Sequence, residues 1–167
     1  MRVLLPGSYD PVTLGHLDII KRCSEKYGEV FAVVFVNPDK KYMFGAEDRV
    51  RMLSAAVRGL SNVTVGYSGG LVIDYCRDNG ISVIVKGIRN EKDLAYEEPM
   101  AAWNLEHGGV RTEYMRADVK YSGISSTLVR ERLLSGGSVS ELIPEGALEI
   151  AYQALGGDEV DHSGGTV

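Results

Sequence analysis

Cysteine is scarce in this chain, and so are long apolar runs. The two cysteines, Cys23 and Cys76, have no partner at metal-ligand spacing and lie within apolar helical patterns. This pattern predicts reduced cysteines in the core of a cytoplasmic protein rather than a disulfide framework. The longest apolar run, residues 30–36, is far too short to span a bilayer. We therefore expect neither secretion nor insertion into a membrane.

An excess of positive charge is also lacking. The chain has 18 Lys and Arg residues against 23 Asp and Glu residues, which gives a formal charge of −5. Because a surface that neutralises a nucleic-acid backbone needs an excess of cations, no nucleic-acid partner is expected. A small anionic substrate remains compatible with this charge, since the local charge around a site matters more than the total.

The length of 167 residues and the apolar content of 44% are enough for one domain with its own core. We expect this domain over residues 1–155. The glycine-rich, acidic segment 156–167 has no periodicity and is expected to be a mobile tail.

Short apolar segments alternate with helical patterns along the chain. Strands are expected at about 2–5, 30–36, 62–65, 83–86 and 111–115. Helices are expected at about 14–27, 47–59, 71–79, 91–107, 125–134 and 144–155, with Gly28, Gly80 and Gly108 just past three helix ends. This order predicts an α/β fold: a doubly wound, Rossmann-like, five-stranded parallel sheet with helices on both faces and C-terminal helices. Ligands are then expected at the carboxyl ends of the strands.

The segment GSYDPVTLGH, residues 7–16, lies where the first strand ends and the first helix begins. Backbone N–H groups and the helix dipole face an anion at such a position. We expect His16 to be a cation held against phosphate there. Taken alone, however, a single histidine near a helix start is more often a cap or a surface residue.

A second hydroxyl-rich segment, YSGISST at residues 121–127, opens the helix expected at 125–134. One hydroxyl would suffice as an N-cap, so three in a row after a glycine are more than capping requires. This segment favours a second helix N-terminus that faces an anion.

Basic residues follow two further strands. Lys40 and Lys41 follow the second strand, although a charged pair in a loop is usually just solvated. Lys86 follows the buried run 83–85 directly, and the adjacent Gly87 would let backbone approach a phosphate closely. The sequence has no catalytic triad, zinc-ligand spacing or P-loop. Histidine, lysine, arginine and backbone amides without a side-chain nucleophile suit direct displacement at phosphorus.

Four motifs carry a resemblance to a known family. They are GSYDPVTLGH (7–16), NPDKKYMF (37–44), VKGIRNEKDLAYE (85–97) and ISSTLVRE (124–131). The first is similar to the T/HxGH signature of the nucleotidyltransferase superfamily, and the last to its second signature. Within that superfamily the chain resembles the phosphopantetheine adenylyltransferases. The resemblance implies transfer of AMP from ATP to 4′-phosphopantetheine, giving dephospho-coenzyme A and pyrophosphate by in-line displacement without a covalent enzyme intermediate. It also implies Mg²⁺, a homohexamer and possible feedback binding of coenzyme A.

The resemblance also implies which residues form the site. His16 and Lys40 would be catalytic. The phosphopantetheine site would comprise Ser8, Lys40, Val72 and Lys86. The ATP site would comprise Ser8, Tyr9, His16, Gly87, Ile88, Arg89, Glu97, Tyr121, Ser122, Gly123, Ile124, Ser125, Ser126 and Thr127, with no metal ligand from the protein.

The chain departs from the family at three positions. The family often has arginine where this chain has Lys86, and commonly an aromatic residue where this chain has Gly123. In addition, Pro99 interrupts an expected helix. Two other functions remain open. A nicotinamide or nicotinate mononucleotide adenylyltransferase is similar at both signatures, but usually has histidine where Thr13 stands. A non-catalytic nucleotide-binding regulator would keep the pocket without turnover.

Overall fold

Five parallel strands form a single sheet in the order β3-β2-β1-β4-β5. The computed structural model describes residues 1–156, so the expected tail lies, apart from Gly156, outside the described residues. The strands are β1 (Arg2–Gly7), β2 (Glu29–Phe35), β3 (Val63–Ser68), β4 (Val83–Ile88) and β5 (Arg111–Arg116). The chain starts in the middle of the sheet, where β1 pairs with both β2 and β4. The switch point of this doubly wound topology therefore lies between β1 and β4.

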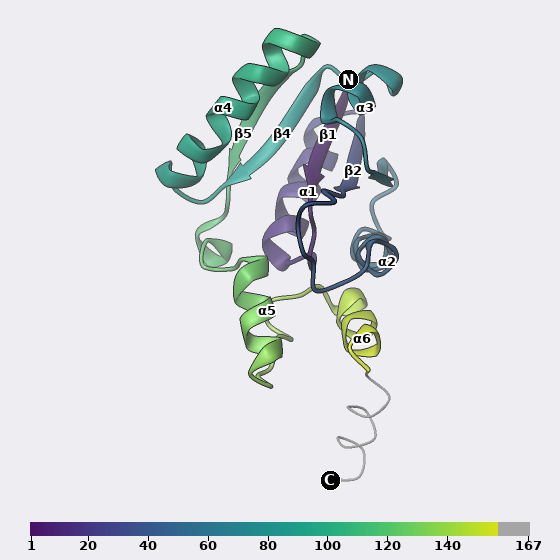
Figure 1. Ribbon diagram of the computed structural model, residues 1–167, viewed down its shortest axis with the longest axis vertical. Helices are drawn as coiled ribbons and strands as arrows, with labels where there is room; N and C mark the ends of the chain where they lie inside the picture. Colours follow the sequence, from purple (N-terminus) through teal and green to yellow (C-terminus); the bar gives the residue numbers. More distant parts are fainter. Residues whose placement is uncertain (157–167) are drawn as a thin grey trace.

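Helices connect the strands and continue beyond the last one. They are α1 (Leu14–Lys26), α2 (Ala46–Ala56), α3 (Val72–Asp78), α4 (Glu91–Gly108), α5 (Ser126–Leu134) and α6 (Glu145–Ala154), with a short 3₁₀ turn, η1 (Val119–Tyr121). Helix α4 continues through Pro99. Helices α5 and α6 lie beyond the carboxyl ends of the strands (Figure 1). Among residues 1–156, no helix is both long and apolar enough to cross a membrane.

The two faces of the sheet carry separate apolar clusters. Val3 and Leu5 of β1 belong to a large cluster with buried side chains of α1, α2 and α6, whereas Leu4 belongs to a smaller one. This split follows from the two-residue period of a strand, which sends neighbouring side chains to opposite faces. Cys23 lies in the large cluster and Cys76 in the small one, and both are free thiols. Helices on both faces confirm the predicted α/β architecture.

Three glycines were expected just past helix ends; Gly28 and Gly80 lie there, and of the three only Gly80 is left-handed. Gly80, after α3, has a φ of +65°, the left-handed conformation that glycine adopts most readily. Gly28 is not left-handed, because α1 ends at an extended Tyr27. At the end of α4 the left-handed residue is Gly109, with a φ of +64°, and Gly108 still belongs to the helix.

Candidate active site

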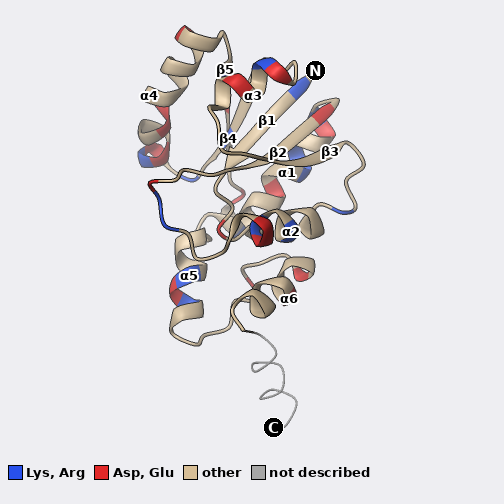
Figure 2. Ribbon diagram, turned by 45° about the vertical axis from the view of Figure 1, so that its right-hand side comes forward, with Lys and Arg blue, Asp and Glu red and all other residues tan. Residues whose placement is uncertain are grey.

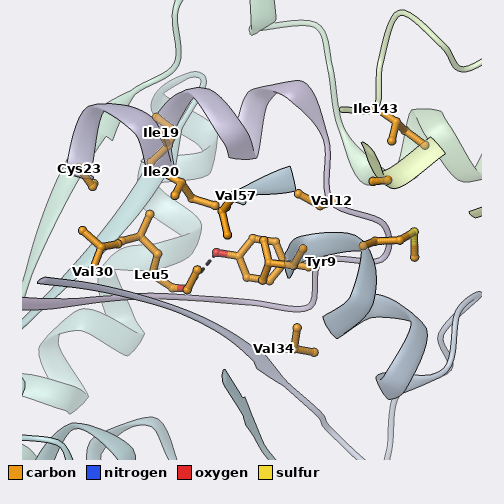
Figure 3. Packing of buried hydrophobic residues seen from close by; sticks show 14 of the residues in the cluster. Leu5, Tyr9, Val12, Ile19, Ile20, Cys23, Val30, Val34, Val57 and Ile143 are labelled. Carbon is orange, nitrogen blue, oxygen red and sulfur yellow. Dashed lines mark hydrogen bonds between the residues drawn. The ribbon is translucent and has the colours of Figure 1, made fainter. Parts of the chain in front are cut away.

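The turn between β1 and α1 buries one residue that was expected at a ligand. The Tyr9 side chain is 5% exposed, and its hydroxyl donates a 2.8 Å hydrogen bond to the carbonyl of Leu5 (Figure 3). Its ring packs against the ring of His16, with 4.9 Å between the centroids. The Tyr9 side chain therefore faces the core and packs against His16, and the expected contact of Tyr9 with ATP stays a prediction.

His16 and Thr13 cap the start of α1 reciprocally. The Thr13 hydroxyl oxygen accepts a bond from the backbone N–H of His16, at 3.2 Å, and the backbone N–H of Thr13 donates to His16 Nδ1, at 2.9 Å. This is a capping box in which histidine takes the place of the usual glutamate. Because Nδ1 accepts this bond, it carries no proton, and the neutral ring has its proton on Nε2.

The electrostatic surroundings of His16 also favour its neutral form. Burial lowers the pKa of His16 to about 4, and the positive charges of Lys86 and Arg89 contribute in the same direction. The ring of His16 is therefore expected to be neutral in the unliganded protein, and a histidine cation against a bound phosphate stays a prediction. Its Nε2–H group is a neutral hydrogen-bond donor.

The hydroxyls at the start of α5 each have a distinct partner. The Ser125 hydroxyl is the N-cap and accepts from the backbone N–H of Leu128, at 3.1 Å. Ser126 Oγ donates to the carbonyl of Pro11, at 2.8 Å, and so ties α5 to the β1–α1 turn. Thr127 Oγ1 accepts from Arg130, at 3.2 Å. Two of the three hydroxyls therefore bond neighbouring protein groups and do not cap α5, and their expected place at an anion stays a prediction.

A cavity of about 360 Å³ brings the two signature segments together. We call it the His16 cavity. It is lined by Thr13, Gly15, His16, Ile19, Gly87, Arg89, Asp93, Tyr96, Glu97, Ala117, Tyr121, Ile124, Ser125 and Ser126. Two segments more than 100 residues apart thus share one cavity at the carboxyl edge of the sheet, as expected for a ligand site in this fold.

A second cavity, of about 680 Å³, contains every residue expected to bind the acceptor. We call it the Lys40 cavity. Its polar lining includes Ser8, Lys40 and Lys86, and Nζ of Lys40 donates to Ser8 Oγ at 3.4 Å. The remaining lining is largely apolar and includes Leu71, Val72, Met100, Ala101 and Trp103. The cavity therefore suits an elongated ligand with an anionic end and an apolar arm.

Glu97 lines both cavities, and its carboxylate lies 3.4 Å from Nζ of Lys86. Arg89 is paired in the same way with Asp93, at 3.1 Å. Charges of both signs gather at the beginning of α4 (Figure 2). By contrast, Lys40 forms no ion pair with a carboxylate among residues 1–156. Within this part of the chain, Lys40 is the site lysine whose charge is not already compensated.

Several expected ATP contacts lie outside the His16 cavity. Ser8 lines only the Lys40 cavity, and Ile88 is 3% exposed in the core. Ser122, Gly123 and Thr127 line neither cavity. Conversely, four cavity-lining residues on the first turns of α4 and elsewhere were not expected from the sequence: Ile19, Asp93, Tyr96 and Ala117. The helical spacing of Asp93 and Tyr96 with Glu97, on one side of α4, is a signal that could have found two of them.

Comparisons with known proteins agree with this geometry. The model of the cytidylyltransferase-like family matches residues 4–132. A phosphopantetheine adenylyltransferase of Thermobifida fusca is 43% identical over 143 residues, which cover 86% of this chain and 87% of that protein. A phosphopantetheine adenylyltransferase of Micrococcus luteus is 41% identical over 148 residues, covering 88% of this chain and 94% of that protein. The chain therefore belongs to the phosphopantetheine adenylyltransferases within the cytidylyltransferase-like family.

Proposed function

We propose that this chain transfers AMP from ATP to 4′-phosphopantetheine and releases pyrophosphate, which forms dephospho-coenzyme A. The observation that carries the proposal is the pair of neighbouring cavities that share Glu97. One has the donor groups of two helix starts, which suit a triphosphate. The other has cations at one end and an apolar wall. Two dissimilar substrates can thus be held side by side, as the names of the relatives suggest.

The chemistry of the Lys40 cavity fits this acceptor. A pantetheine arm is long and only moderately polar, and its phosphate is a dianion near neutral pH. Lys40 and Ser8 would bind the phosphate, while Val72 and Trp103 would contact the arm. A mononucleotide acceptor would instead need partners for a ribose and a base. The acceptor assay described below compares the two directly.

The reaction needs alignment more than a reactive side chain. An oxygen of the acceptor phosphate attacks the α-phosphorus of ATP, the new P–O bond forms, and the bond to the bridging oxygen of pyrophosphate breaks. His16 would donate its Nε2–H to a phosphate oxygen, and Lys40 would balance the growing negative charge. Orienting two bound substrates can supply on the order of 7–11 kcal/mol of the lowered barrier.

Mg²⁺ is proposed as a companion of ATP. Among residues 1–156, no group of three or more His, Cys, Asp or Glu side chains could hold a metal ion. The phosphate oxygens of the nucleotide are hard ligands of the kind Mg²⁺ prefers, so the ion would arrive with its substrate. We also propose a cytoplasmic location, which the two free thiols support. A homohexamer and feedback binding of coenzyme A remain proposals drawn from the family resemblance.

An acceptor-resolved assay tests the proposed function. The protein is incubated with ATP, Mg²⁺ and either 4′-phosphopantetheine or nicotinamide mononucleotide, and pyrophosphate is measured. We expect pyrophosphate only with 4′-phosphopantetheine, together with a product of the mass of dephospho-coenzyme A. Pyrophosphate only with nicotinamide mononucleotide would replace the proposal by its nearest rival. Calorimetric binding of ATP without pyrophosphate from either acceptor would indicate a nucleotide-binding regulator.

A further inference from the structure

Arg49 of α2 is a buried cation that the proposed chemistry does not use. Its side chain is 1% exposed, and it is the largest of the fully buried side chains. Among residues 1–156, it forms no ion pair with a carboxylate. Burying a guanidinium without a counter-ion is costly, so a position of this kind needs a specific compensation.

The partners of Arg49 come from two loops at the Lys40 cavity. Nη1 donates to the carbonyl of Ser8, at 2.9 Å, and Nε donates to the carbonyl of Phe44, at 3.0 Å. The guanidinium also lies over the ring of Tyr42, 3.9 Å from its centroid. Ser8 and Tyr42 both line the Lys40 cavity. One buried group thus joins the β1–α1 turn to the loop that carries Lys40.

The same loop is held at a second point by Tyr42. Its hydroxyl accepts from the backbone N–H of Asn37, at 2.9 Å, close to the start of the loop. Nζ of Lys40 lies 5.8 Å from the centroid of the Tyr42 ring. Lys40 itself is exposed, and a lysine side chain that nothing restrains loses considerable conformational freedom when it binds an anion. Stacking between Arg49 and Tyr42 therefore limits where Lys40 can point.

We propose that Arg49 is a positioning residue that fixes Ser8 and the Lys40 loop at the spacing needed to bind the phosphate of the acceptor. The inference rests on the proposed function, because it takes the Lys40 cavity as the acceptor site. Lysine cannot replace Arg49, because only the planar guanidinium can donate to two carbonyls and stack on a ring at the same time. Removing the guanidinium loosens the end of the Lys40 cavity that binds the phosphate. It leaves the apolar wall of that cavity and the His16 cavity intact.

Comparing the binding of 4′-phosphopantetheine with that of pantetheine distinguishes a role in positioning from a general effect on stability. Calorimetry measures the binding of 4′-phosphopantetheine, pantetheine and ATP to the wild-type protein and to Arg49→Lys. The substitution is expected to weaken 4′-phosphopantetheine at least about tenfold while pantetheine and ATP change by less than about twofold. Arg51→Lys is the matched control, because Arg51 lies on the same helix but is exposed and paired with Asp48 at 3.2 Å. It should bind all three ligands like the wild type.

Steady-state kinetics give the second readout. KM for the acceptor should rise in Arg49→Lys much more than KM for ATP, whereas a merely structural defect would lower the active fraction and leave both KM values unchanged. If Arg49→Lys does not fold, Tyr42→Phe and Tyr42→Leu are compared, because both lose the hydroxyl bond to Asn37 but only leucine removes the ring under Arg49. A further selective loss for the phosphorylated ligand is expected with leucine, and equal losses in the two variants would overturn the proposal.

Equal weakening of pantetheine and 4′-phosphopantetheine, or no weakening of either, would overturn the proposal. Failure of the wild-type protein to bind 4′-phosphopantetheine or to release pyrophosphate would instead refute the proposed function. The two failures are therefore distinguishable.

Discussion

Lowering the pH from 8 to 5 is expected to remove about 2 kcal/mol of the free energy of unfolding through His16 alone. The pKa of this histidine falls from 6.5 to about 4 on folding, because the ring is desolvated and faces two cations. Between these pH values the unfolded chain binds more protons than the folded protein. Stability from this group is therefore fully present above pH 6.5 and is lost as the pH falls towards 4.

The capping geometry supplies a matched control. His16→Asn keeps an acceptor that can take the bond from Thr13 N–H, but it does not titrate. Urea unfolding of both proteins at pH 8 and pH 5 isolates the contribution of the ring, because the other titratable groups are common to the two. Subtracting the two pH dependences should leave about 2 kcal/mol, and somewhat less if water reaches the partly exposed ring.

Proton NMR of the imidazole gives an independent measurement. The His16 signal is identified by its disappearance in His16→Asn, and its shift should stay constant from pH 8 down to about pH 5. A midpoint near 6.5, or parallel pH dependences of stability for the two proteins, would refute the lowered pKa of His16.

Four further outcomes follow from contacts in the structure. In the pyrophosphate assay, His16→Asn should lower kcat at least about 10²-fold with a smaller change in KM for ATP, because the Nε2–H donor is lost; near-normal kcat would remove His16 from catalysis. Asp10→Ala should lower the urea-derived free energy of unfolding by about 2–4 kcal/mol, since two backbone N–H groups bonded to Asp10 at 2.9 Å lose their acceptor. Gly108→Ala should cost about 1–2 kcal/mol, because the new Cβ would lie 2.7 Å from Cγ2 of Ile73. Gly123→Ala has nothing within 4 Å and should change stability by less than about 0.5 kcal/mol.

The order of strands and helices was predictable because each element carries its own local signal. Buried strands appear as short apolar runs, and helices as longer amphipathic patterns. The end of α4 was harder to predict, since Gly108 and Gly109 are adjacent and either could adopt a left-handed conformation. The contact between Gly108 and Ile73 of α3 reserves Gly108 for close packing. A tertiary contact of this kind leaves no trace in the local sequence.

The candidate site was partly predictable for the same reason. Polar residues that follow strands must meet at one edge of a parallel sheet, so the positions of His16, Lys40 and Lys86 could be expected. The direction in which a side chain points could not be predicted in this way. Tyr9 lies in the same motif as His16, yet its φ of 47° and its bond to the β1 backbone direct the ring into the core. Arg49 was missed because an arginine within an amphipathic helix normally indicates the solvent-exposed face.

Asp10 connects the walls of the Lys40 cavity and the His16 cavity through hydrogen bonds of its carboxylate and its carbonyl. Its carboxylate is 3% exposed and accepts from the backbone N–H groups of Met43 and Phe44, in the loop after Lys40. Its carbonyl accepts from Arg130 of α5, at 2.8 Å, the helix whose N-terminus lines the His16 cavity. In-line displacement depends on the angle between attacking oxygen, phosphorus and leaving oxygen. Because this turn is bonded to the walls of both cavities, we expect the T/HxGH segment to contribute alignment as well as a histidine.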